Sequence, residues 1–150
     1  IDKLKKALLD GVKQLLTITN HEDWKMPSLY SFGWYNVYKM GEGMGIHSHA
    51  YNSNAIIGWN IPIWAKESYT MYYHPIKFIP EMINVPNKIG WLTLFPKIIP
   101  HSASNNQYEK LRITLAGDIS TNVYAPDMGG AFESLKDPVT IIPGLSTVEL

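Results

Sequence analysis

The stretch GWLTLFPKIIPHSASNN (residues 90–106) sets the pattern for the middle of the chain. It contains a run rich in aromatic and β-branched residues, a turn between two prolines, and a second short run that begins at His101. Such runs, bounded by turn-forming residues, predict strands at Trp91–Phe95 and His101–Ser104. The same pattern of short apolar runs separated by turn-forming residues extends from Gly33 to Val123.

Strands of the same kind are predicted at Trp34–Met40, Ala55–Ile63, Tyr69–His74 and Leu111–Ser120. The segments between them are rich in turn-forming residues: Gly41–Gly45, Ala65–Glu67, Pro75–Lys88 and Asn105–Lys110. Pro75–Lys88 is long for a loop, and we expect it to cross the mouth of a barrel. Short strands at this spacing predict a mainly β fold, either an antiparallel sandwich or a barrel.

The two ends of the chain differ from this middle region. Residues Asp2 to Thr17 carry Leu8, Val12 and other apolar residues at helical spacing, which predicts an amphipathic helix packed on a sheet. The tail from Ala125 to Leu150 is predicted to be irregular, with one edge strand near Val139–Ile142. We therefore expect a single domain over residues 1–150, with its core at about residues 33–123.

Composition excludes several classes of protein. The chain has 150 residues, and 13 basic residues balance 13 acidic ones, which argues against a nucleic-acid partner. It has no cysteine, so disulfides, thiolate zinc sites and cysteine nucleophiles are impossible. No apolar run reaches the length of a membrane span. The expected location is the cytoplasm, since a reducing compartment fits the absence of disulfides.

Three histidines are placed as a metal site would place them. His47 and His49 are two residues apart, so on a strand both side chains would point to the same face. His101 follows another predicted strand and would add a third imidazole from a neighbouring strand. Imidazole binds iron, zinc, copper and nickel alike, so the ligands do not name the metal. The alternative is that these are ordinary surface or core histidines.

The only arginine in the chain, Arg112, begins the last long strand. Alternation places Arg112 and Thr114 on one face and the aliphatic residues on the other, which we expect to pack under the helix. Arg112 would then point into the barrel, where a guanidinium can bind a carboxylate through two parallel hydrogen bonds. The alternatives are a salt bridge to Glu109 or Asp118, or simple exposure.

The order of these elements is H-x-H, then G-x5-P-x4-H, then R-x-T on the following strand. It resembles the small Fe(II)- and 2-oxoglutarate-dependent oxygenases, particularly their compact bacterial and phage members, over roughly Trp34 to Asn122. The resemblance implies a double-stranded β-helix, which is a jelly-roll or cupin-like barrel. It also implies that His47 and His101 hold Fe(II), that Arg112 pairs with the distal carboxylate of 2-oxoglutarate, and that Thr114 takes the small-hydroxyl position beside it.

The chain departs from that family at one position. Most members carry H-x-D or H-x-E, giving two histidines and one carboxylate around the iron. Here His49 stands in place of the carboxylate. We favour His49 as the third metal ligand over the alternative, in which it lies outside the coordination shell and water completes the site. Cupins are the competing resemblance, but they would place a glutamate where this chain has Ser53 and Asn54, and they do not account for Arg112.

The implied activity is that of a dioxygenase that hydroxylates a C–H bond with O2 and 2-oxoglutarate. The expected partner is a small-molecule or peptide substrate, and a homodimer stays open. Residues beside the metal motif are candidates to line the pocket, although each is more often structural: Tyr35, Asn36, Tyr38 and Tyr51–Asn54. The alternatives are a cupin-type metalloprotein without 2-oxoglutarate and a non-enzymatic jelly-roll binding or structural module.

Overall fold

The structure is a computed structural model that describes residues 2–21, 23, 28–50, 55–75, 81–121, 139–141 and 148–149. In these ranges the chain forms one helix and ten strands. In chain order they are α1 (Asp2–Ile18), β1 (Tyr30–Tyr38), β2 (Met44–His47), β3 (Ala55–Trp64), β4 (Tyr69–Tyr73), β5 (Met82–Pro86), β6 (Thr93–Pro96), β7 (His101–Ala103), β8 (Arg112–Ser120), β9 (Val139–Ile141) and β10 (Val148–Glu149).

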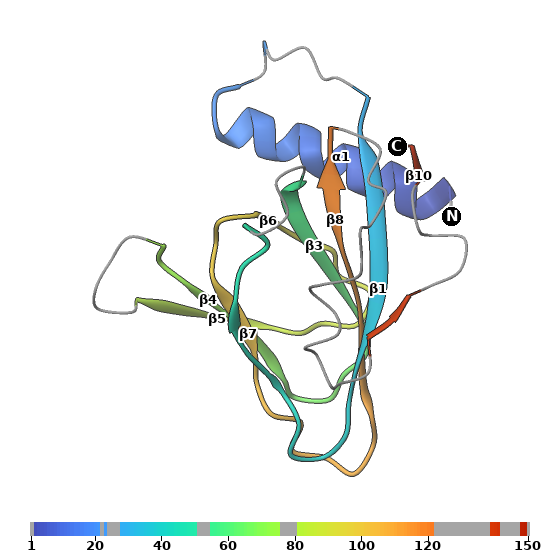
Figure 1. The fold of residues 1–150 in the computed structure, drawn as a ribbon, viewed down its shortest axis with the longest axis vertical. Helices are drawn as coiled ribbons and strands as arrows, with labels where there is room; N and C mark the ends of the chain where they lie inside the picture. Colours follow the sequence, from blue (N-terminus) through green and yellow to red (C-terminus); the bar gives the residue numbers. More distant parts are fainter. Residues whose placement is uncertain are drawn as a thin grey trace.

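The strands form two antiparallel sheets. The larger sheet has the order β10-β1-β8-β3-β6, with β9 also paired to β1, and the smaller has the order β2-β7-β4-β5. Figure 1 shows α1 lying across the strands of the larger sheet. The predicted fold class, a mainly β jelly roll with an N-terminal helix on its sheet, is confirmed.

One face of the larger sheet packs against α1. Leu8 and Val12 are the two buried residues of the helix, and they belong to the same apolar cluster as Trp59, Leu115 and Ile119. Trp59 and Ile119 are fully buried. Burying each large apolar side chain contributes about 1.5–3 kcal/mol to stability, so this layer fastens the helix to the sheet.

A glycine makes room for the tryptophan in that layer. A Cβ atom on Gly117 would come within 2.5 Å of the Trp59 ring and would also collide with the backbone oxygen of Phe32. The absence of a side chain at this position therefore lets β8 and the indole pack directly against each other.

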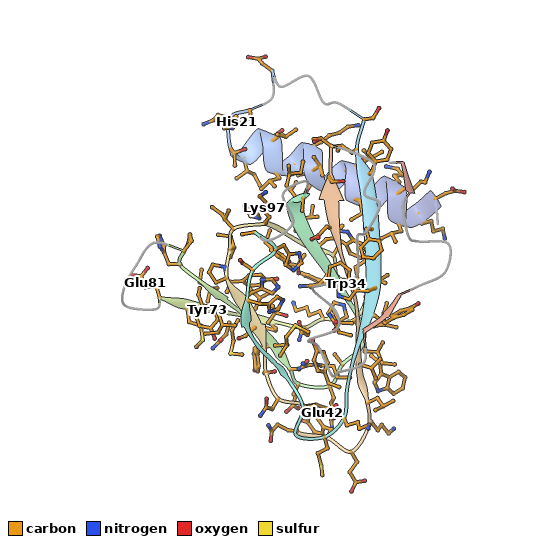
Figure 2. All side chains as sticks on the ribbon, viewed as in Figure 1. His21, Trp34, Glu42, Tyr73, Glu81 and Lys97 are labelled. Atoms are coloured by element: carbon orange, nitrogen blue, oxygen red, sulfur yellow. The ribbon has the colours of Figure 1, made fainter. Side chains whose placement is uncertain are left out.

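The opposite face of the larger sheet turns toward the smaller sheet. On β8 the residues of even number point this way, and Arg112, Thr114 and Ala116 line one cavity between the sheets. Trp34 on β1 lies on the same side, as Figure 2 shows. Arg112 and Thr114 thus share the face turned to the cavity, as alternation predicted, and Leu115 lies under the helix, whereas Leu111 precedes β8 and is exposed.

Two elements lie where the sequence predicted turns. β2 begins at Met44, inside the glycine-rich segment, because Gly43 packs tightly against the backbone of Ala103 on β7. β5 lies within the predicted crossing loop Pro75–Lys88 and pairs with β4 along its full length. It is an edge strand, where Pro86 is tolerated because no further strand needs its missing N–H.

The first strand also begins earlier than predicted, at Tyr30 rather than Trp34. Gly33 does not interrupt it, because the Trp59 ring packs over that position, 3.2 Å from where a Cβ atom would lie. In the tail, the predicted edge strand is found as β9 beside β1, and Ile142 lies outside the described residues. No helix in the described part of the chain has both the length and the apolar character needed to span a bilayer.

Candidate metal centre

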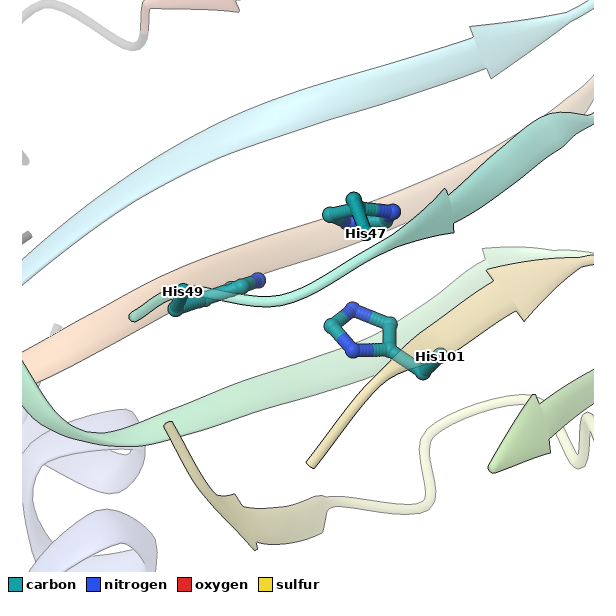
Figure 3. Close-up of side chains that lie close together, drawn as sticks. All are labelled: His47, His49 and His101. Carbon is teal, nitrogen blue, oxygen red and sulfur yellow. The ribbon is translucent and has the colours of Figure 1, made fainter. Parts of the chain in front are cut away.

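Three histidines converge between the two sheets, as Figure 3 shows. His47 ends β2 and His101 begins β7, and the two are direct partners in the register of these strands. Their ring centroids are 4.2 Å apart. One ring nitrogen from each of His47, His49 and His101 lies within 4.8 Å of the others, so a single ion could contact all three.

His49 reaches this cluster by a route that strand alternation did not predict. β2 ends at His47, and His49 lies in the bend that follows, where its backbone N–H donates a 3.0 Å hydrogen bond to the oxygen of Lys97. Its ring is 5.1 Å from the ring of His101 between centroids. The bend, rather than a shared strand face, therefore aims the two residues of the H-x-H pair at one point.

The orientation of His47 and His101 is fixed by their own backbone. Nδ1 of His47 lies 3.0 Å from the oxygen of Gly45, and Nδ1 of His101 lies 3.1 Å from the oxygen of Ile99. A carbonyl oxygen only accepts hydrogen bonds, so each Nδ1 carries the proton. Each Nε2 is then the nitrogen with a lone pair, which is the form of imidazole that binds a metal ion.

Burial keeps these two rings uncharged. It lowers the pKa of His101 to about 3, with a further contribution from the neighbouring His47. It also lowers the pKa of His47 below its ordinary value. Neutral imidazoles at neutral pH suit a cation, whereas three charged rings at this distance would repel one another.

Asp118 is the functional candidate that the sequence did not single out for this site. Its Oδ1 accepts a hydrogen bond from Nδ1 of His49, and both side chains are buried. The sequence suggested Asp118 only as a salt-bridge partner of Arg112. Six residues along a strand span roughly 20 Å, so that pairing is out of reach on an extended β8. One sequence signal could have identified Asp118. It is an even-numbered residue of β8, so strand alternation places it on the same face as Arg112 and Thr114.

Aromatic side chains pack against the histidines. The Phe95 ring lies 4.5 Å from that of His101 and 5.4 Å from that of His49. Tyr72 also faces His101, and its hydroxyl accepts a 3.1 Å hydrogen bond from Asn60. Burial raises the pKa of Tyr72 to about 12, so its hydroxyl stays protonated.

Arg112 lies inside the barrel with most of its hydrogen-bonding capacity unused. The residue is only 2% exposed. Nη1 donates to the backbone oxygen of Ser104 at 2.6 Å, and the guanidinium lies 4.1 Å from the centroid of the Tyr38 ring. Nε and Nη2 are buried and have no hydrogen-bond partner among the described residues.

These two orphan donors point to an anion. Burial lowers the pKa of Arg112, but a guanidinium keeps its charge in proteins. A buried cation without an anionic partner is costly. No salt bridge from Arg112 to Glu109 or Asp118 is present among the described residues.

One narrow cavity of about 50 Å³ connects the histidines with Arg112. Thr114 and Asn36 line it, and the side-chain oxygen of Asn36 is a further buried atom without a partner among the described residues. His47 is less buried than the other two histidines and marks the side from which solvent reaches them. A second cavity of about 570 Å³ also borders Arg112, beside Trp64 and other exposed side chains.

The other residues that the sequence suggested for the pocket have different environments. Tyr35 packs with the apolar cluster under α1, so it is structural. Tyr38 borders the cavity as the platform beneath Arg112. Tyr51–Asn54, Ser53 included, lie outside the described residues. His21 lies beside the end of α1, away from the barrel interior (Figure 2).

No protein-family model and no curated protein sequence matches the chain. Solved structures do match in fold. A non-haem α-ketoglutarate-dependent carbocyclase, SnoK, from nogalamycin biosynthesis matches with a TM-score of 0.58 and 11% identity, over 83% of this chain and 64% of that one. A prolyl-4-hydroxylase from Pseudomonas putida matches with a TM-score of 0.51 and 13% identity, over 61% of this chain and 52% of that one.

A 2OG-Fe(II) oxygenase family oxidoreductase from Burkholderia pseudomallei matches with a TM-score of 0.51 and 15% identity, over 61% of this chain and 45% of that one. The chain thus spans less than two thirds of the length of each of these structures. At such identities the likeness concerns the fold. It confirms at that level the resemblance drawn from the sequence, that the chain has the barrel of the 2-oxoglutarate/Fe(II) oxygenases.

Proposed function

We propose that this protein is a non-haem Fe(II)- and 2-oxoglutarate-dependent dioxygenase that hydroxylates a small-molecule or peptide substrate. One observation carries the proposal. A cluster of three histidines lines the same small cavity as a buried arginine, two of whose donors have no partner in the part of the chain that the structure describes. The first feature suits a metal ion, and the second suits a carboxylate held at a distance from it.

The residues of the cavity suit both groups. His47, His49 and His101 would hold the iron, and Arg112 would bind the distal carboxylate of the co-substrate through its unpartnered Nε and Nη2. Thr114 would contribute a hydroxyl beside that carboxylate. Together, Fe(II), 2-oxoglutarate and O2 supply the oxidising power for attack on a C–H bond, with succinate and CO2 as co-products.

The cavity is small. Its volume of about 50 Å³ compares with roughly 10–15 Å³ needed for one water, so its walls would have to open to admit a dicarboxylic keto acid. The Phe95 and Tyr72 rings lie against His101 and make that wall less polar, which would strengthen the pairing of Arg112 with an anion.

The substrate would approach from the side where His47 is less buried. The balanced charge of the chain favours a neutral small molecule or a peptide over nucleic acid. A homodimer stays a prediction, which light scattering would test.

Calorimetric titration of protein loaded with Mn(II), a redox-stable substitute for Fe(II), tests the proposal. Three ligands would be compared: 2-oxoglutarate, pyruvate, which lacks the distal carboxylate, and glutarate, which lacks the keto group. We expect 2-oxoglutarate to bind more tightly than either. Metal binding with no preference among the three ligands would instead support a cupin-type metalloprotein. Absence of metal binding would leave a non-enzymatic jelly-roll module.

A further inference from the structure

His49 differs from the other two histidines in what fixes its ring. His47 and His101 use backbone oxygens two residues before them, whereas Nδ1 of His49 bonds to a side chain, that of Asp118. This partner lies 69 residues away along the chain, on β8. The contact therefore exists only in the folded barrel and depends on how β8 meets the bend after β2.

The fold holds both partners closely. Asp118 is 5% exposed and His49 is 2% exposed. On β8, Asp118 lies between its register partners Phe32 on β1 and Gly58 on β3, in the middle of the larger sheet. A Cβ atom on Gly58 would lie only 3.1 Å from Nδ1 of His49 and would collide with Phe95. The glycine therefore allows the imidazole to approach β3 on its way to Asp118.

The chemistry of the pair determines which nitrogen of His49 faces the other histidines. An ionised carboxylate only accepts hydrogen bonds, so Nδ1 of His49 must carry the proton. Nε2 is then the nitrogen that remains for a metal ion, as in His47 and His101. All three rings thus present the same nitrogen, but in His49 a negatively charged group imposes this state.

Burying a carboxylate is costly, and a simpler acceptor would orient the ring equally well. What a carboxylate adds is charge. Carboxylates bonded to the far side of a metal-binding imidazole raise its basicity and offset the charge of the ion. In this chain the H-x-H pair lacks the carboxylate that would otherwise lie in the coordination shell, and Asp118 supplies one negative charge directly behind the histidine that replaces it.

We infer that Asp118 is a positioning residue of the metal centre: it fixes the tautomer of His49 and supplies, from outside the coordination shell, the negative charge that the three neutral imidazoles lack. The inference rests on the metal site of the proposed function and adds a role for a residue that would touch neither metal nor substrate. The competing account makes the pair a structural link between the bend and β8.

Two measurements on the whole chain distinguish these accounts. The first is the tautomer of His49 in metal-free protein labelled with ¹⁵N-histidine, read from two-bond ¹⁵N–¹H couplings and assigned with His49→Gln. We expect a proton on Nδ1 in the wild type. An Nδ1 without a proton would overturn the inference without any variant, so the test holds even if variants at Asp118 fail to fold.

The second measurement is the affinity for Co(II) alone, read from its visible spectrum. Asp118→Asn keeps the shape of the side chain but removes its charge, and we expect its Kd to rise by about 10- to 100-fold. Ser120→Ala is the matched control, because Ser120 is also buried and polar and lies two residues further along β8. Its Kd should equal that of the wild type.

The outcomes separate this inference from the proposed function. If the wild type binds Co(II) and Asp118→Asn binds it equally well, Asp118 has only a structural role and the metal site stands without it. If the wild type binds no Co(II), the metal site itself fails and takes the inference with it. A loss of affinity in Asp118→Asn together with a mixed or altered tautomer at His49 supports the role of Asp118.

Discussion

Leu115 and Ile119 of β8 pack against α1, whereas Arg112 and Asp118 of the same strand turn toward the cavity. The helix face is apolar, and Leu115 and Ile119 are buried there. The cavity face holds a buried arginine, two of whose donors have no partner among the described residues, and a buried carboxylate bonded to a histidine. The helix face therefore contributes stability, while the cavity face concentrates the buried polar groups.

This comparison implies that the two faces can be altered separately. Changes under the helix should reduce the free energy of unfolding without altering ligand binding. Changes in the cavity should alter ligand binding, because the buried polar side chains there are the ones that would contact a ligand. Each prediction below tests one side of this separation.

The largest effect is expected at the metal ligands. His101→Ala removes one of three converging imidazoles, so we expect Co(II) affinity to fall by more than the roughly 10- to 100-fold that loss of an outer partner costs. Visible titration measures it. His21→Ala, at an exposed histidine beside the helix end, is the control and should bind like the wild type. Equal affinities in the two variants would remove His101 from the site.

On the helix face, Ile119→Ala should lower the free energy of unfolding by about 2–5 kcal/mol, since the side chain is fully buried. Urea unfolding of metal-free protein measures this loss. The Co(II) affinity should stay at the wild-type value while the protein is folded. A parallel drop in metal affinity would show that the two faces are coupled and that the comparison fails.

Lowering the pH should destabilise the metal-free protein, because buried histidines line the cavity. An unperturbed histidine has a pKa of about 6.5. Burial lowers the pKa of His101 to about 3, and lowers that of His47 as well. Below the unfolded pKa the unfolded chain therefore takes up protons that the folded chain resists. This part of the stability is fully present above about pH 6.5 and is lost as the pH falls toward the folded pKa.

Urea unfolding in the presence of a chelator, at a series of pH values, measures that slope. His101→Ala should show a shallower slope than the wild type, because it has one fewer group that must stay neutral when folded. Identical slopes would mean that burial does not lower the pKa of His101.

Arg112→Lys tests the anion site. A lysine keeps the charge but cannot form two parallel hydrogen bonds, so we expect 2-oxoglutarate to bind about 10- to 100-fold more weakly, in line with the 1.5–3 kcal/mol of a charged hydrogen bond. Calorimetry on Mn(II)-loaded protein measures it, and metal affinity should be unaffected. Lys110→Ala, which removes a nearby cation from the second cavity, is the control. If Arg112→Lys binds 2-oxoglutarate as tightly as the wild type, Arg112 does not bind the distal carboxylate.

The smallest effect is expected at Thr114. Thr114→Val keeps the shape and removes the hydroxyl, which contributes about 1 kcal/mol as a neutral hydrogen bond. The affinity for 2-oxoglutarate should fall by less than tenfold in the same calorimetric titration. A loss as large as that of Arg112→Lys would give Thr114 a role equal to the arginine. If the affinity is unchanged, Thr114 lines the cavity without contributing a hydrogen bond to the ligand.

The sequence was sufficient for the parts that local patterns determine. Alternation on β8 predicted that Arg112 and Thr114 share one face. The sequence also grouped the three histidines correctly, although the bend after β2, and not alternation on a strand, brings His49 to the other two. Asp118 was not recognised, because its partner is 69 residues away and no local pattern links them. β5 was missed for a related reason, since its run ends in proline and only its pairing with β4 makes it a strand.

The central claim is that the cavity face holds iron and a keto acid together. Its most direct test is the visible spectrum of metal-free protein mixed anaerobically with Fe(II) and then with 2-oxoglutarate. We predict a weak charge-transfer band that appears only when both are present and is lost in His101→Ala. Tight Fe(II) binding with no band at saturating 2-oxoglutarate would contradict the claim, because the keto acid would then not reach the metal.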